Sequence, residues 1–191
     1  MRKSLMIIVL FTLTICMGQA QQIKDFSLTN VMTGESVALS SLKASKGVVI
    51  IFTSHTCPYA KYYDRRINKL ISSYEGAEVN FLMVNSEVKP QESAEAMLAE
   101  AKSKGYKVPY LADKNQTVMK MLGVKKSPEA VVLKRNGQGF SVLYLGAIDN
   151  NPQVESDVKE QYLLLAIKSL LDGTKPAKTT VRPIGCIIKG A

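Results

Sequence analysis

Cysteine is the residue type in this sequence that most directly indicates chemistry. Cys57 comes directly after the β-branched and aromatic run GVVIIFT (47–53), which predicts a buried strand, and directly before a helical pattern. The first N–H groups of a helix lack internal partners and carry partial positive charge, which favours a thiolate over a thiol. Pro58 suits the first helical turn, where no N–H is needed. We therefore expect Cys57 to be a reactive nucleophile; the alternative is a small buried apolar side chain.

Cys186, near the end of the chain, is the candidate partner of Cys57. If the C-terminal tail folds back over the start of the helix, a Cys186 thiolate can attack a mixed disulfide or a sulfenic acid on Cys57. Two other interpretations stay open. The two residues can form a permanent disulfide that fixes the tail, or they can be unconnected, and their spacing alone does not decide.

The first twenty residues predict export. A basic start is followed by an apolar run (5–15) and by the segment MGQA (17–20), a pattern typical of a secretory signal peptide cleaved after Ala20. The apolar run is too short for a lasting transmembrane anchor. A periplasmic or secreted protein would occupy an oxidising compartment, where disulfides persist. The alternative is a lipoprotein attached through Cys16, but Ile15 stands where such signals carry a small residue.

The remaining chain predicts one α/β domain (21–175) and a C-terminal tail (176–191) that carries Cys186. The alternation of strands and helices implies parallel pairing in the first half, and Asn136-Gly137 predicts a hairpin. We expect a central mixed β-sheet flanked by helices on both faces. The main strands are expected at 47–53, 78–85, 129–134 and 140–145, with short extended pieces near Val37 and at 109–111. The helices are expected at 57–75, 91–104, 116–122 and 151–171, with Thr56 and Asn151 as N-caps and no periodic structure in the tail.

Three segments carry a resemblance to the thioredoxin superfamily. Thr56-Cys57-Pro58-Tyr59-Ala60 after a buried strand resembles the active-site segment in which C-x-x-C opens the first long helix, although Ala60 replaces the second cysteine. Ser127-Pro128, just before a strand, is similar to the superfamily's cis-proline position. The ending IGCIIK (184–189), together with His55 and the CPY segment, is similar to a peroxiredoxin-like, AhpC/TSA-related redoxin branch that ends in I-G-C-x-I-K.

This resemblance implies a thioredoxin-like fold and a thiol-based oxidoreductase whose partners are protein or small-molecule thiols and disulfides. Its external reductant is not indicated. By role, it implies Cys57 and Cys186 as catalytic residues, Ser127, Pro128, Pro58 and Tyr59 as substrate-binding residues, and Ser54, His55 and Thr56 as supporting residues.

Two alternative functions remain. Peroxiredoxins usually show P-x-x-x-T-x-x-C, and the matching positions here are Ile50, Ser54 and Cys57, so a peroxide reductase would use the Ser54 hydroxyl in place of threonine. The other alternative is a non-catalytic binding module of the same fold with a structural Cys57–Cys186 disulfide.

Composition excludes several other classes. The chain has net charge +9, and +7 after loss of Arg2 and Lys3, but its basic and acidic residues alternate along the predicted helices, so no nucleic-acid partner is expected. One histidine and two distant cysteines provide no metal-ligand cluster. No glycine-rich phosphate loop follows a strand, so no cofactor is expected.

Overall fold

The computed structural model describes residues 22–190 except 43 and 138. A nine-stranded sheet has the strand order β1-β9-β8-β4-β5-β6-β2-β3, with β10 paired to β9. Its strands are β1 (Gln22–Ile23), β2 (Ser27–Asn30), β3 (Ser36–Ala38), β4 (Gly47–Phe52), β5 (Val79–Asn85), β6 (Tyr110–Ala112), β8 (Glu129–Asn136), β9 (Gly139–Gly146) and β10 (Thr180–Val181). A separate two-stranded sheet joins β7 (Lys126–Ser127) to β11 (Cys186–Ile187).

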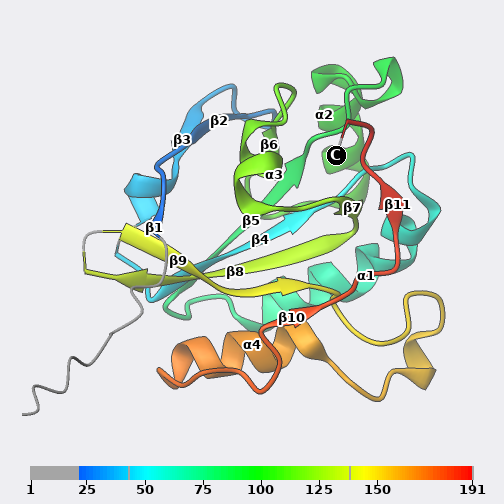
Figure 1. Ribbon diagram of the computed structural model, residues 1–191. Coiled ribbons are helices and arrows are strands. Elements are labelled where there is room, and N and C mark those ends of the chain that lie inside the picture. Colours follow the sequence, from blue (N-terminus) through cyan, green and yellow to red (C-terminus); the bar gives the residue numbers. More distant parts are fainter. Residues whose placement is uncertain (1–21, 43, 138, 191) are drawn as a thin grey trace, which may run out of the picture.

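Helices cover both faces of the large sheet (Figure 1). The α-helices are α1 (Pro58–Ser73), α2 (Ala94–Lys104), α3 (Thr117–Leu122) and α4 (Tyr162–Leu171), and the short 3₁₀ helices are η1 (Leu39–Leu42), η2 (Pro90–Glu92) and η3 (Glu155–Asp157). Side chains of α1, α2 and α4 pack with Val49 and Ile51 in one core, whereas α3 and η1 pack with Val48, Ile50 and Phe52 in the other. Alternate residues of β4 thus face opposite layers, as expected for a strand buried on both sides.

The sheet confirms the predicted mixed topology. β4 pairs in parallel with β5 and antiparallel with β8, and β5 pairs in parallel with β6. β8 and β9 form the predicted hairpin, in which Asn136 lies opposite Gly139. The carboxyl end of β4 therefore lies in the middle of the sheet, and the loop that follows it carries Cys57 into α1.

The prediction of a helix over 151–171 is wrong for the first half of this range, where no α-helix forms. Only α4 is α-helical there, and the residues before it form a loop that contains η3. The Asn151 side chain accepts hydrogen bonds from the N–H groups of Gln153 and Val154, which closes a turn rather than capping a helix. Arg66 of α1 also donates to the backbone carbonyls of Asn151 and Pro152, which fixes this loop against the domain.

Two further expectations need correction. The helix predicted from residue 91 begins later, because Ser93 is the N-cap of α2 and its side chain accepts from the Ala96 N–H. The tail, expected to be irregular, contains β10, which pairs in parallel with the end of β9, and β11. The predicted signal peptide (1–20), including Cys16, lies outside the described residues.

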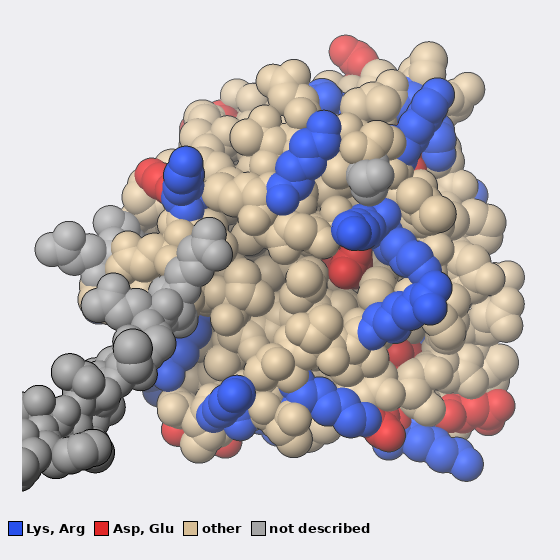
Figure 2. Space-filling model, in the orientation of Figure 1, with Lys and Arg blue, Asp and Glu red and all other residues tan. Residues whose placement is uncertain are grey.

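No helix within the described part of the chain is long and apolar enough to cross a membrane. Figure 2 shows lysine and arginine side chains distributed over one face of the molecule, with acidic side chains among them. This arrangement is that of a solvated surface rather than of a single basic patch.

Candidate active site around Cys57 and Cys186

Cys57 lies where the sequence predicted it, at the junction of β4 and α1. It is the N-cap residue of α1, with extended backbone angles (φ −88°, ψ 119°), and Pro58 is the first helical residue. Its carbonyl accepts from the Lys61 N–H at 3.2 Å. The expected Thr56 cap is therefore wrong by one position. Cys57 is only 2% exposed, so its sulfur lies under neighbouring groups.

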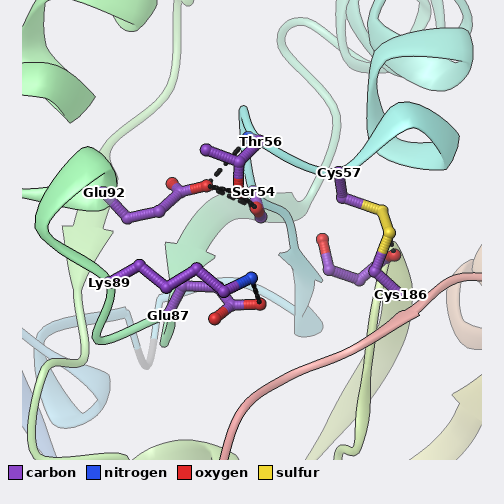
Figure 3. Close-up of a disulfide and its surroundings, with 8 residues drawn as sticks. Ser54, Thr56, Cys57, Glu87, Lys89, Glu92 and Cys186 are labelled. Atoms are coloured by element: carbon purple, nitrogen blue, oxygen red, sulfur yellow. Dashed lines mark hydrogen bonds and ion pairs between the residues drawn. A yellow bond between two sulfur atoms is a disulfide. The ribbon is translucent and has the colours of Figure 1, made fainter.

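A disulfide joins Cys57 to Cys186, with their Cα atoms 5.9 Å apart (Figure 3). This bond rules out the interpretation that the two cysteines are unconnected. The Cys57 sulfur also lies 3.1 Å from the carbonyl oxygen of Ser127. With the disulfide closed this is a contact, and a reduced Cys57 thiol could donate a hydrogen bond there. Cys186 itself is partly exposed.

The tail reaches Cys57 by adding a strand to β7. Cys186 lies opposite Ser127, and Ile187 lies opposite Lys126, in an antiparallel pair. The pairing continues with a 3.0 Å hydrogen bond from the Ile188 N–H to the Lys125 carbonyl. The Ser127-Pro128 peptide bond is cis, as its resemblance to the superfamily position implied. The predicted cis-proline segment and the predicted second cysteine thus meet beside Cys57.

Gly185 allows this close approach. A Cβ atom at residue 185 would lie 2.5 Å from the Ser127 carbonyl oxygen and 3.2 Å from the Pro128 nitrogen. Both are backbone atoms that cannot move aside without distorting β7. Any larger residue at position 185 would therefore push the tail off the β7 edge.

Ser127 has a buried hydroxyl for which the described residues provide no hydrogen-bond partner. Directly opposed residues of an antiparallel pair project their side chains to the same face, so the Ser127 side chain lies on the face that carries the Cys186 sulfur. A buried hydroxyl donor without a hydrogen-bond partner is energetically unfavourable. A cysteine thiolate formed beside the Ser127 hydroxyl is a suitable acceptor for it.

Sequence reasoning missed Glu92, a fully buried acid at the end of η2. One carboxylate oxygen accepts from the Ser54 hydroxyl (2.5 Å), the Thr56 N–H (2.8 Å) and the Thr56 hydroxyl (2.6 Å). The other accepts from the Asn85 amide (2.6 Å) and lies 2.8 Å from the His55 Nδ1. Burial by itself raises the pKa of Glu92, but the bonds from Ser54, Thr56 and Asn85 outweigh it and hold the pKa below its usual value.

All three predicted supporting residues therefore contact the Glu92 carboxylate. In Figure 3 the Glu92 carboxylate points to Ser54 and Thr56, which belong to the loop that leads to Cys57. The His55 ring also faces η2. Its Nε2 lies 2.6 Å from the Gln91 carbonyl and donates to it, because a carbonyl oxygen can only accept. Together these contacts fix the three residues before Cys57 to η2.

A second buried acid, Glu87, lies nearby and is 1% exposed. One of its carboxylate oxygens is 3.3 Å from the Lys89 ammonium group. The Lys114 ammonium donates to the Glu87 carbonyl and to the Asn85 side chain, and burial lowers the pKa of Lys114. The ammonium groups of Lys89 and Lys114 thus both lie close to Glu87. No group of three or more His, Cys, Asp or Glu side chains in the described residues is arranged to hold a metal ion.

Of the predicted substrate-binding residues, Ser127 and Pro128 lie beside the disulfide, and the tail covers β7. Pro58 is exposed and Tyr59 is partly exposed at the start of α1, so both can form part of the surface around Cys57.

Comparisons with known proteins identify the family of the chain. The AhpC/TSA family model matches residues 20–142, which include Cys57 and the Ser127-Pro128 segment but end before Cys186. No curated protein matches the chain.

Two solved structures resemble most of the chain. A hypothetical protein (SMc02350) from Sinorhizobium meliloti is 28% identical, with a TM-score of 0.80 over 90% of this chain and 94% of that one. An uncharacterized conserved protein from Geobacillus kaustophilus is 29% identical, with a TM-score of 0.81 over 90% of this chain and 92% of that one.

A more distant structure shows the fold alone. A putative thiol:disulfide interchange protein DsbE from Chlorobium tepidum is 17% identical, with a TM-score of 0.60 over 80% of this chain and 96% of that one. The fold is therefore thioredoxin-like. The range matched by the family model contains β1 to β8, the start of β9 and the cysteine-bearing helix α1. The chain belongs to the AhpC/TSA family of thioredoxin-like redoxins.

Proposed function

We propose that the protein is an exported thiol–disulfide oxidoreductase that alternates between the Cys57–Cys186 disulfide and the free dithiol. One observation carries the proposal: the disulfide joins the N-cap of α1 to a strand only two residues long at the edge of β7. Backbone pairing joins this strand to β7 and not to the main sheet, so its release breaks no hydrogen-bond ladder of that sheet. Export rests on the predicted signal peptide.

The reaction begins from the dithiol. The Cys57 thiolate attacks one sulfur of a partner disulfide, forming a mixed disulfide and releasing the partner's other sulfur as a thiolate. Cys186 then attacks the Cys57 sulfur, the partner's first sulfur leaves, and the Cys57–Cys186 disulfide closes. Two electrons have passed to the partner, and both enzyme cysteines are oxidised.

The difference in burial indicates where an external dithiol reductant enters. Cys57 is 2% exposed, whereas Cys186 is partly exposed, so an incoming thiolate reaches the Cys186 sulfur first. Cys57 is then the leaving group, and the helix N-terminus stabilises the thiolate it becomes. The second thiol of the reductant frees Cys186.

The site favours disulfide exchange over peroxide reduction. A peroxidatic site would require the Ser54 hydroxyl to meet the peroxide, but that hydroxyl donates to the Glu92 carboxylate. The binding-module alternative differs only in the permanence of the disulfide, which the following experiment tests.

The pH dependence of alkylation tests the reactive role of Cys57. In mature protein with Cys186→Ser, we expect the apparent pKa of Cys57 to lie at least about one unit below that of an ordinary thiol, about 8.5, because it starts a helix. The matched control is Cys57→Ser, in which only Cys186 reacts. A Cys57 with an ordinary titration, combined with a wild-type disulfide that millimolar glutathione leaves intact, would instead favour the binding module.

The buried Ser127 hydroxyl is expected to stabilise the Cys57 thiolate. Adding Ser127→Ala to the Cys186→Ser protein should raise the apparent pKa of Cys57 by about one unit, because a hydrogen bond to a charged group contributes about 1.5 kcal/mol. Ser45→Ala, at the opposite end of β4, is the control and should leave the alkylation profile unchanged. An unchanged profile in the Ser127 variant would show that this hydroxyl does not contact the thiolate.

A further inference from the structure

We infer that β11 is a built-in copy of the partner segment that this site accepts: an extended, disulfide-bonded segment with glycine directly before the cysteine and an aliphatic residue two positions after it. The inference rests on the proposed function and specifies its substrate class.

The β7 edge beside Cys57 holds a single strand. The sulfur of Cys186 reaches Cys57 because its backbone pairs with β7. A partner cysteine that joins Cys57 has to bring its own backbone to the same edge, where the carbonyls of Lys125 and Ser127 lie. Backbone pairing of this kind accepts any extended sequence, so selectivity has to come from side chains.

The tail shows which side chains the edge accepts. The position before the cysteine admits only glycine, since a Cβ at Gly185 would lie 2.5 Å from the Ser127 carbonyl oxygen. The position two after it requires an apolar side chain, because Ile188 is 1% exposed and belongs to the core cluster that includes Val118 and Leu122 of α3. The intervening Ile187 is 70% exposed, so the side chain at this position contributes no selectivity for the partner segment.

The tail remains close when it leaves the edge. β10 stays paired with β9, and Cys186 lies five positions after Val181, a reach of about 17 Å when extended. A tether this short keeps Cys186 at an effective concentration on the order of millimolar. In the oxidised protein the tail thus covers the β7 edge, and no partner segment can pair there. In the dithiol the edge is free to bind a partner segment. The returning tail then displaces that segment as Cys186 attacks Cys57.

The test uses the full mature chain with Cys186→Ser and an octapeptide of tail sequence, RPIGCIIK, whose cysteine carries a thionitrobenzoate leaving group. Attack by Cys57 joins the peptide to the protein and releases coloured thionitrobenzoate. We expect this peptide to react at least about tenfold faster than versions with valine for the glycine or aspartate for the second of the two isoleucines after the cysteine. Aspartate for the first of these isoleucines is the matched control and should change the rate less than about twofold.

A second protein tests displacement of the tail. Gly185→Val combined with Cys186→Ser should free the β7 edge and accelerate the tail-sequence peptide at least about fivefold over Cys186→Ser alone. Equal rates for all peptides would overturn the inference, and the peptide comparison alone decides it if the double variant does not fold. A Cys57 that reacts with Ellman's reagent but does not discriminate among peptides refutes only this inference. A Cys57 inert to Ellman's reagent refutes the proposed function itself.

Discussion

Replacing Cys186 by serine is expected to stop the catalytic cycle at its midpoint. Cys57 would still attack a partner disulfide, but no thiol of the same chain would release the partner. At a dithiothreitol concentration of about 10 μM, about a hundredfold below the effective concentration of the tethered Cys186, reduction of insulin should therefore fall by about two orders of magnitude. A covalent protein–insulin complex that disappears on full reduction should accumulate on non-reducing gels.

Two controls separate this result from a general loss of structure. Cys57→Ser should give neither turnover nor a covalent complex, because the attacking sulfur is absent. Leu165→Ser, an exposed substitution on α4, should retain wild-type turnover. If Cys186→Ser keeps its turnover and no complex accumulates, Cys186 does not resolve the mixed disulfide, and the disulfide is a structural link.

The sequence was informative where local patterns coincide with the site. The unbroken apolar run of β4 and the stripe of α1 placed Cys57 at a strand-to-helix junction, and the structure confirms this position. The Ser127-Pro128 segment was identified by its resemblance to the superfamily's cis-proline position, just before a strand, and the bond is cis. These features depend on neighbours in the chain, so a sequence pattern can predict them.

The remaining features depend on residues far apart in the sequence. β10 and β11 are each two residues long and form only because β9 and β7 offer edges to pair with. Glu92 lies in the short 3₁₀ helix η2, and its sequence pattern predicted the start of an ordinary solvent-exposed α-helix. Its burial follows from Ser54 and Thr56, 38 and 36 residues earlier, so no local period indicates it.

The Glu92 carboxylate is expected to make the largest single contribution of a polar group to the stability of the site. Glu92→Gln would leave one acceptor oxygen where the wild type has two. Either the Asn85 amide or the Ser54 and Thr56 donors would then face the amide N–H groups of the new side chain. Leaving buried donors without acceptors should lower the free energy of unfolding at pH 7 by about 3 kcal/mol. Urea unfolding of the oxidised proteins would measure the difference, with the exposed Glu75→Gln as control.

The stabilisation by the Glu92 carboxylate depends on pH. The fold lowers the pKa of Glu92, so the unfolded chain binds a proton at a higher pH than the folded protein does. The stabilisation is therefore complete above the unfolded value of about 4.3 and is lost as the pH falls through the folded value. Wild type should lose stability below about pH 4.5 more steeply than Glu92→Gln, and the gap between them should narrow. Parallel stability curves over this range would mean that the fold leaves the pKa of Glu92 unchanged, and that its contacts with Ser54 and Thr56 do not depend on its charge.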